Sequence, residues 1–216
     1  MNNQTTNEKI IQDLSWRYAT KIFDPTKKVS VEDLHTILES GRLSPSSSGI
    51  EMWKFIVVEN KDIRTKLREV SFDQPKVTDA SHIIVIAYRT DGEVNMIKER
   101  LERTAKIQNQ KVEDLAGLKG ILDMALKMKL DTGTLEPWIK SQTYIPLGMM
   151  IETASLLKID NCAMEGFIPE KVDEVLGLKE KNLKSATMLA LGYRGDDPAS
   201  SRPKVRREFD EVVEFI

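Results

Sequence analysis

Residues 83–88, Ile-Ile-Val-Ile-Ala-Tyr, decide the fold of this chain. A short, uninterrupted apolar run that is rich in β-branched side chains is typical of a strand that other elements cover on both faces. The stretch therefore predicts the central strand of a sheet. The rest of the chain must supply the strands beside it and the helices above and below it.

Further strands and helices are predicted on either side of this run. Aromatic and β-branched stretches indicate strands, and a capping Ser30 followed by a periodic apolar face indicates a helix. No internal repeat or linker interrupts the pattern, so we expect a mixed α/β arrangement in one domain over residues 1–216. The candidate strands are residues 53–58, 161–164 and 186–192, and the candidate helices begin near residue 10 and cover residues 31–41, 61–70 and 169–176.

Two segments carry more apolar surface than one chain needs to bury. Residues 136–157 predict a long helix whose second half is apolar on every side, which indicates a central helix or one packed against a second subunit. Pro146 inside it predicts a kink. The tail, residues 212–216 (VVEFI), resembles a strand but has no sequence neighbour with which to pair. Residues 91–131 are helical and heavily charged, which is typical of a solvated helix face.

The composition excludes several classes of protein. The 216 residues are 40% hydrophobic and 31% charged, which excludes a disordered, collagen-like or multi-span membrane protein. A formal net charge of −2 argues against a general binder of nucleic acid or of anionic membranes. The single cysteine, Cys162, excludes an intramolecular disulfide and fits a reducing compartment. Because the first six residues are polar and lack the apolar stretch of a secretory signal, we expect a cytoplasmic protein.

Familiar catalytic and cofactor motifs are absent from the sequence. His35 and His82 are the only histidines, and there is no H-E-x-x-H or C-x-x-C set, so no metal site is expected. The chain also lacks G-x-S-x-G, a P-loop and G-x-G-x-x-G. A redox cofactor would therefore have to bind in a cradle other than a Walker or Rossmann site.

Two short basic clusters stand out against the near-neutral background. Arg17 and Lys21 lie four residues apart near the end of the first helix, and Lys204 and Arg206 alternate in a segment that Pro203 keeps extended. Two or three converging cationic donors are what a phosphate monoester requires. Each cluster taken alone is also compatible with ordinary surface charge.

Two further segments have the composition of ligand-binding loops. Residues 44–48 (SPSSS) are rich in hydroxyl groups, and Gly166 follows a predicted strand where backbone N–H groups can approach a ligand closely. An ordinary surface loop and a simple strand-to-helix turn are the respective alternatives.

The order of these motifs is more informative than any one of them. The chain contains R-x-x-x-K at residues 17–21, S-P-S-S at 44–47 before W-K-F, D-A-S-H at 79–82 before the buried strand, E-G-F at 165–167 and P-K-x-R at 203–206. In that order they resemble the nitroreductase family of FMN-dependent NAD(P)H oxidoreductases, and the resemblance covers residues 10–207. It implies an α+β fold, a mixed sheet of four or five strands flanked by helices, and an intertwined homodimer with two FMN sites at the interface.

In such a dimer the two unexplained apolar segments would find partners. Helix 136–157 would pack between the subunits, and residues 207–216 would pair with the partner's sheet, which removes an exposed edge. Residues 91–135 would form a variable helical excursion near the acceptor.

The resemblance also implies a set of cofactor contacts. Arg17, Lys204 and Arg206 would hold the FMN phosphate. Lys21 would lie near the pyrimidine edge of the flavin, where a cation stabilises negative charge on the reduced ring. The chemistry would rest on flavin N5, with no catalytic side chain and no metal. The remaining implied contacts are Pro45, Ser46 and Ser47 in a loop from the partner subunit, Lys76 beside the ring, and Glu165 and Gly166 at N5.

Several positions depart from the family pattern. Tyr18 and Ala19 stand where many relatives have His-Ser or Arg-Ser, so Ala19 lacks a hydroxyl that can touch phosphate in those relatives. Residues 51–53 are E-M-W in place of Q-P-W or E-P-W, which loosens a turn. Asp73 stands where some members have Asn, and an ionised Asp could accept from flavin N3–H but would repel the reduced ring. Tyr18, Ala19 and Asp73 are still expected to contact the cofactor.

The implied activity is ping-pong hydride transfer. NAD(P)H would reduce FMN at N5, and an electron-poor acceptor such as a nitroaromatic or a quinone would then take the hydride. Two alternatives stay open: the same scaffold acting as a flavin or pteridine reductase, a dehalogenase or an azoline oxidase, and a non-catalytic flavin-binding dimer. No nucleic acid or membrane partner is expected. The residues do not identify the physiological acceptor or rank NADH against NADPH.

Overall fold

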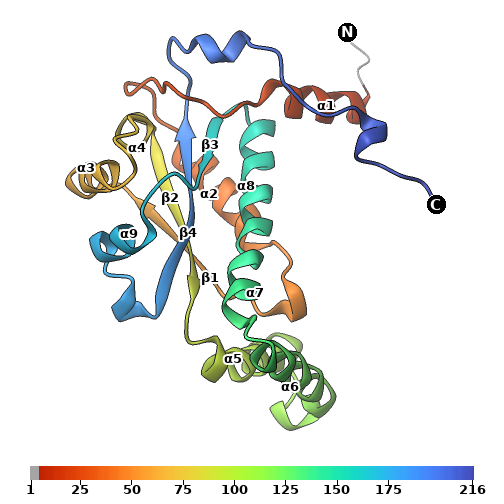
Figure 1. Cartoon of the computed structure of the whole chain (residues 1–216). Coiled ribbons are helices and arrows are strands. Elements are labelled where there is room, and N and C mark those ends of the chain that lie inside the picture. The colour runs from red at the N-terminus through yellow and green to blue at the C-terminus, as the bar shows by residue number, and fades with distance from the viewer. Residues whose placement is uncertain (1–4) are drawn as a thin grey trace.

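A four-stranded antiparallel sheet forms the centre of the computed structural model, which describes residues 5–216. The strands lie in the order β1-β2-β4-β3 (Figure 1). The residues from Ile83 to Ala87 are fully buried, so the apolar run that opened the sequence does form a central strand. The strands are β1 (Trp53–Val58), β2 (His82–Arg89), β3 (Asp160–Met164) and β4 (Leu183–Gly192), the last beginning three residues earlier than predicted.

Helices cover both faces of this sheet, so the predicted α+β fold class is confirmed. In Figure 1, α3, α4 and α9 lie on one side of the strands and α2 and α8 on the other, while α5 and α6 lie beyond the lower end. Two separate apolar clusters fill the two sides, one around Met188 and one around Met150. The helices are α1 (Thr6–Trp16), α2 (Val31–Arg42), α3 (Lys61–Glu69), α4 (Lys76–Asp79), α5 (Gly92–Gln108), α6 (Ala116–Asp131), α7 (Leu135–Gln142), α8 (Tyr144–Leu156) and α9 (Pro169–Leu176).

The outer edge of β3 is only partly covered. A parallel bridge joins Ala19 to Asn161, and the amide of Thr20 donates to the carbonyl of Asn161 at 3.3 Å. The first segment of the chain thus adds a short parallel contact to an otherwise antiparallel set of strands. Beyond this bridge, the lower half of β3 leads to the turn at Glu165 with its edge open.

The predicted long helix 136–157 is in fact two helices. α7 ends at Gln142 and α8 begins at Tyr144, with Thr143 between them. Pro146 falls in the first turn of α8 and cannot donate to the carbonyl of Gln142, so the continuous hydrogen-bond ladder is interrupted three residues before the proline. The kink is therefore real but lies at Thr143.

α8 is apolar on every side but buried on only one. Met150 and Ala154 face the sheet and are fully buried, whereas Ile145, Leu156 and Leu157 are exposed in the single chain. In the part of the chain that the structure describes, α8 included, no helix combines the length and apolarity that a membrane span requires.

The predicted strand at residues 212–216 is not formed. A short 3-10 turn at Phe209–Glu211 is followed by irregular backbone, and Phe215 is 87% exposed. A strand needs a second strand to receive its hydrogen bonds, and none lies beside this tail in one chain. Its pairing with a partner subunit stays a prediction.

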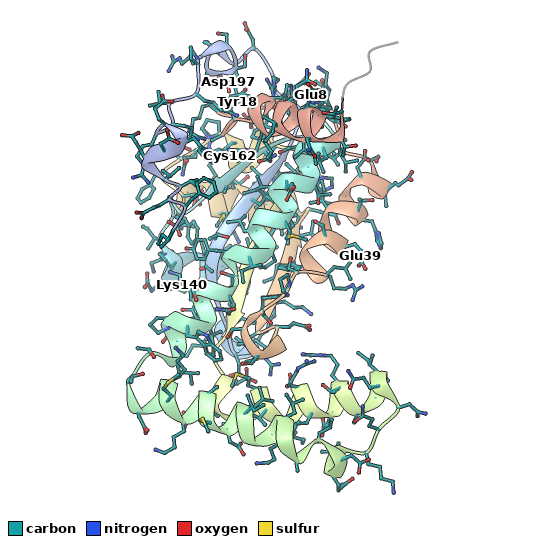
Figure 2. All side chains as sticks on the ribbon, turned by 90° about the vertical axis from the view of Figure 1, so that its right-hand side faces the viewer. Glu8, Tyr18, Glu39, Lys140, Cys162 and Asp197 are labelled. Atoms are coloured by element: carbon teal, nitrogen blue, oxygen red, sulfur yellow. The ribbon has the colours of Figure 1, made fainter. Side chains whose placement is uncertain are left out.

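The charged stretch 91–131 is helical, as predicted. It forms α5 and α6, which pack antiparallel through Leu101, Leu122 and their neighbours. In Figure 2 this pair lies below the sheet and its covering helices and projects past the end of α2. A second apolar cluster, which includes Met96 of α5, joins the pair to Tyr88 of β2 and Ile139 of α7.

Candidate functional site

The candidate site begins where α1 ends. Thr5 and Glu8 form a capping box at the start of α1, and Arg17 leaves the helix with extended backbone angles (φ −67°, ψ 136°). Successive side chains of an extended segment point to opposite sides. Arg17 and Ala19 therefore share one side of this segment, and the chain bends at Lys21 and Ile22.

Three predicted phosphate ligands lie together at the end of α1. The ammonium of Lys204 donates to the backbone carbonyl of Leu14 at 3.0 Å and to that of Arg17. Burial lowers the pKa of Arg17, and repulsion from Arg206 adds to the effect. Burial also lowers the pKa of Lys204, with further lowering by Arg17 and Arg206. Arg17 and Lys204, which are 187 positions apart in sequence, thus form one cationic cluster with Arg206, which we call the Arg17 cluster (Arg17, Lys204 and Arg206).

The Arg17 cluster has no counterion of its own. None of the ion pairs seen within residues 5–216 includes Arg17, Lys204 or Arg206. Mutually repelling, partly desolvated cations are stabilised by an anion that takes hydrogen bonds from several of them. The residues present therefore fit a phosphate group.

A further cation lies buried below this cluster. Lys76, at the start of α4, is 9% exposed, and its Nζ lies 3.5 Å from the Sγ of Cys162 on β3. Lys76 contacts β3 through Cys162, and the segment that carries Arg17 meets the same strand through the bridge of Ala19 to Asn161.

The turn after β3 carries the next predicted residues. The hydroxyl of Tyr144, at the start of α8, donates to the carboxylate of Glu165, and this contact together with burial raises the pKa of Tyr144 to about 12. The carbonyl of Gly166 accepts from Nε2 of Gln74 at 2.7 Å. A Cβ on Gly166 would lie 3.1 Å from the same Nε2, so a side chain here would crowd Gln74.

A cavity of about 280 Å³ opens beside this turn, between the start of α8 and the open edge of β3. Leu147, Ala163 and Met164 give it apolar walls. Thr187 contributes a buried hydroxyl that has no hydrogen-bond partner within the described chain. The cavity can receive a flat, largely apolar group with a few polar atoms.

Asp73 is exposed in the single chain and pairs with a residue outside the predicted set of cofactor contacts. Its side chain is 81% exposed and forms an ion pair with Arg68 at 2.7 Å. Phe72 and Asp73 both have positive φ (54° and 51°), so the chain turns sharply between α3 and α4. No contact of Asp73 with the Arg17 cluster is seen, and its predicted role beside the cofactor stays a prediction.

The serine loop lies at the other end of α8 from the Arg17 cluster. The amide of Ser47 donates to Oε1 of the buried Gln142 at 2.8 Å. Gly49, with φ 63°, lets the guanidinium of Arg100 approach to 2.8 Å from the position a Cβ would occupy. Within residues 5–216, no hydrogen bond joins this loop to the Arg17 cluster, so one chain does not assemble all predicted contacts. The loop residues concerned are Pro45, Ser46 and Ser47.

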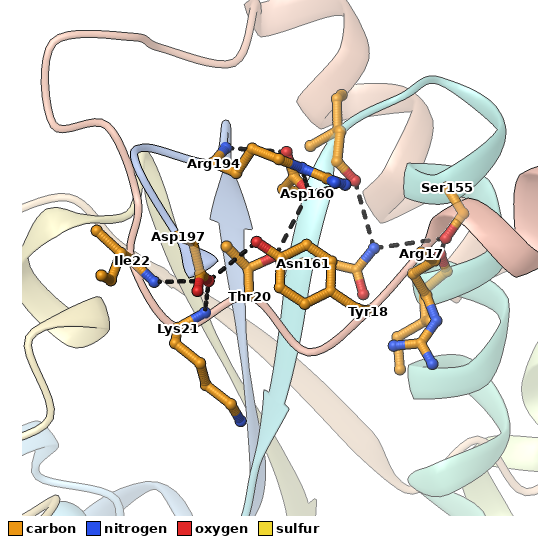
Figure 3. Close-up of polar contacts among 12 residues, drawn as sticks. Arg17, Tyr18, Thr20, Lys21, Ile22, Ser155, Asp160, Asn161, Arg194 and Asp197 are labelled. Carbon is orange, nitrogen blue, oxygen red and sulfur yellow. Dashed lines mark hydrogen bonds and ion pairs between the residues drawn. The ribbon is translucent and has the colours of Figure 1, made fainter. Parts of the chain in front are cut away.

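Tyr18 has a role that sequence reasoning missed. Its hydroxyl donates to Oδ2 of Asp197 at 2.9 Å, and its ring lies 4.6 Å from the guanidinium of Arg194 (Figure 3). The same Asp197 oxygen accepts from the backbone amide of Lys21 at 2.7 Å. Asp197-Pro198 has the pattern of a turn cap in sequence, but nothing in the sequence links it to a segment 179 residues earlier.

Among residues 5–216, no group of three His, Cys, Asp or Glu side chains is arranged to hold a metal ion.

Comparison with known proteins gives a consistent result. The model of the "Nitroreductase family" matches residues 14–193. A Staphylococcus epidermidis protein named "Putative NAD(P)H nitroreductase" is 37% identical over 217 residues, covering 97% of this chain and 98% of the relative. A Bacillus subtilis structure described as a "putative nitroreductase" superposes with a TM-score of 0.83 at 18% identity, covering 96% of this chain and 99% of the other. An Exiguobacterium sibiricum structure described as a "putative nitroreductase in complex with FMN" gives 0.78 at 18% identity, with 96% and 97% coverage.

Proposed function

The chain belongs to the nitroreductase family, and we propose that it is an FMN-dependent oxidoreductase that uses NAD(P)H to reduce electron-poor acceptors such as nitroaromatics and quinones. The observation that carries the proposal is the Arg17 cluster. Three cations from the two ends of the chain converge, and among residues 5–216 none of them forms an ion pair with a carboxylate, which is the arrangement that a phosphate monoester requires. The family's curated relatives are named for NAD(P)H-dependent nitroreduction, in agreement with this chemistry.

Named residues would hold each part of the cofactor. The Arg17 cluster would bind the phosphate. Lys21 and the buried Lys76 would place positive charge near the pyrimidine edge, and the backbone at Gly166 would approach N5. When bound, FMN supplies the redox chemistry, because it accepts hydride from NAD(P)H and donates it to the acceptor. The protein's own contribution is to orient the ring and to stabilise negative charge on it through Lys21 and Lys76.

We propose in addition that the functional unit is a homodimer. α8 exposes apolar side chains along the side that faces away from the sheet, and the tail exposes several more. Burying such surface against a second copy is favourable, and the serine loop could then complete the partner's site. The exposed apolar side chains concerned are Tyr144, Ile145, Leu156 and Leu157 on α8, Ile11 and Leu14 on α1, and Val205, Phe209, Val212, Phe215 and Ile216 in the tail.

Spectroscopy of the purified protein tests the proposal directly. The protein should be yellow, with about one FMN per chain, and its flavin absorbance should bleach on anaerobic mixing with NADH or NADPH. Reoxidation by a panel of nitroaromatics, quinones, free flavins, pteridines and halogenated aromatics then identifies the acceptor class. A colourless protein that fails to bind added FMN would contradict the proposal, and bound flavin that NAD(P)H does not reduce would identify a non-catalytic binder instead.

A further inference from the structure

One carboxylate organises the segment that carries Arg17 and Lys21. Oδ2 of Asp197 accepts the hydroxyl of Tyr18 at 2.9 Å, the amide of Lys21 at 2.7 Å and the amide of Ile22 at 3.2 Å. Its Oδ1 accepts the amide of Ala199 at 2.9 Å. Asp197 is 4% exposed, and these backbone bonds and the Tyr18 bond lower its pKa against the opposing effect of burial.

Arg194 holds the same segment from its other end. Its guanidinium lies 4.4 Å from the ring of Trp16 and 4.6 Å from that of Tyr18, so it is enclosed by two aromatic faces. Its Nε donates to Oδ1 of Asp160 at 2.7 Å, and its backbone amide donates to Oδ2 of the same residue at 2.9 Å. Arg194 thereby connects Trp16 and Tyr18 to Asp160, the first residue of β3.

The anchored side chains and the site side chains alternate along the segment. Trp16, Tyr18 and Thr20 make the contacts to Arg194, Asp197 and β3, whereas Arg17 and Lys21 make no side-chain contact with Asp197. Figure 3 shows the bonds of Asp197 to Tyr18, Lys21 and Ile22, with the side chains of Lys21 and Arg17 extending away from that carboxylate. The backbone bends at Lys21 and Ile22, whose successive amides donate to the same oxygen of Asp197, so this carboxylate fixes the backbone from which the Lys21 side chain extends.

This anchoring has a specific use in the present chain. The cations of the Arg17 cluster repel one another, so their own charges do not hold Arg17 in place. Ala19, in the middle of the segment, offers no side-chain hydrogen bond that could order it. The bridge of Ala19 to Asn161 holds the middle of the segment, and Asp197 adds three hydrogen bonds from Tyr18, Lys21 and Ile22.

We propose that Asp197 is a positioning residue for the flavin site: by bonding Tyr18, Lys21 and Ile22, it holds the extended segment so that Arg17 and Lys21 point toward the cofactor. The inference rests on the proposed function, since it assigns a task within the same site. Both carboxylate oxygens of Asp197 are used by donors of the chain, so this residue would act through the hydroxyl of Tyr18 and the backbone of residues 21 and 22.

Two variants and one control test this role. Asp197→Asn keeps the size of the side chain but replaces one accepting oxygen by an NH₂ group. The backbone or hydroxyl donors that face this NH₂ group then lose their acceptor. Tyr18→Phe removes a single hydrogen bond and leaves the three backbone donors on Asp197. Asp196→Asn is the matched control, because Asp196 is exposed and its carboxylate makes no hydrogen bond within the described residues. The readouts are FMN affinity by flavin fluorescence, thermal unfolding of the apoprotein, and the midpoint potential of the bound flavin.

Asp197→Asn should weaken FMN binding by about tenfold or more, as expected for loss of charge-assisted hydrogen bonds. Tyr18→Phe should weaken it by a smaller factor, about threefold, because most of the bonds remain. The midpoint potential should fall in Asp197→Asn, since a less ordered Lys21 stabilises the reduced ring less. Asp196→Asn should match the unmodified protein in all three measurements.

Unchanged FMN affinity in both variants would overturn the inference. A weaker affinity that comes with an unchanged potential would also overturn it, because a merely structural role moves unfolding and binding but not the potential. If Asp197→Asn fails to fold, Tyr18→Phe decides by the same criteria. Failure of the unmodified protein to bind FMN would instead refute the proposed function, and this inference with it.

Discussion

Replacing Lys76 by Met should stabilise the apoprotein while weakening cofactor binding. The ammonium of Lys76 is buried at 9% exposure, and its one hydrogen bond in the described structure goes to Sγ of Cys162 at 3.5 Å. A thiol is a weak acceptor and no carboxylate pairs with this lysine, so its desolvation is poorly offset. Cys162 and the adjacent residue Val77 belong to the apolar core. A thioether of similar length would suit such a site better than a charge.

The magnitudes follow from the same contacts. An uncompensated buried cation costs several kcal/mol, and partial solvation reduces the recoverable part to about 1–2 kcal/mol. For a chain of this size each kcal/mol raises Tm by roughly 2–4 °C, so the apoprotein melting temperature should increase by about 2–8 °C. If Lys76 donates to the flavin ring, its loss removes a charge-assisted hydrogen bond of about 1.5–3 kcal/mol, which weakens FMN binding roughly 10- to 100-fold.

Thermal unfolding of the apoprotein and fluorescence titration with FMN measure the two effects. Lys66→Met is the control, because Lys66 is an exposed residue of α3 that forms no ion pair within the described chain. It should change neither quantity. A lower apoprotein Tm for Lys76→Met would refute the argument from buried charge, and an unchanged FMN affinity would remove Lys76 from the cofactor site.

Three further outcomes are expected. The double variant Lys204→Ala with Arg206→Ala should lose FMN, measured by flavin release, by a far larger factor than any fall in apoprotein stability; equal losses would show that these residues are structural. Tyr18 should ionise near pH 12, because burial and Asp197 raise its pKa from 10.0 to about 12. Since the pKa of Tyr18 is higher in the folded than in the unfolded state, the stability that this phenol contributes is complete below pH 10 and is lost toward pH 12. An ultraviolet difference titration against Tyr18→Phe measures the pKa, and ionisation near pH 10 would contradict the hydrogen bond of Tyr18 to Asp197. Deleting residues 207–216 should shift the protein toward the monomer in light-scattering chromatography, and an unchanged mass would argue against the tail as an interface element.

Much of the fold could be predicted because the signals are local. The run at residues 83–88 could be assigned to a central strand since buried strands have a characteristic composition, and the start of α2 since Ser30 accepts the amide of Asp33 as a cap. Residues 136–157 are predicted as one helix with a kink at Pro146, whereas the structure has two helices that divide at Thr143, because a proline disrupts the helix through the carbonyl of Gln142 on the preceding turn. The tail was predicted as a strand from composition alone, without a partner strand to complete it.

The candidate site divides in the same way. Arg17 and Lys204 could be proposed as phosphate ligands from motif order, and the structure brings them together through the bond of Lys204 to the Arg17 carbonyl. The role of Asp197 could not be predicted from the sequence, because it depends on a hydrogen bond from the amide of Lys21, 176 positions away. Nothing in a local pattern records such a pairing.

The sequence alone therefore determines which residues are available: a buried apolar strand, the cations at both ends of the chain, and the turn at Gly166. Their convergence depends on the tertiary structure. α1 must end at Trp16, and Ala19 must pair with the edge of β3. Asp197, near the other end of the chain, must then accept the amide of Lys21. Composition and periodicity report on neighbours within a few residues, whereas a binding site is a set of distances across the fold. The net charge of −2 does not predict the Arg17 cluster, because a sum over the chain contains no information on which charges lie close together.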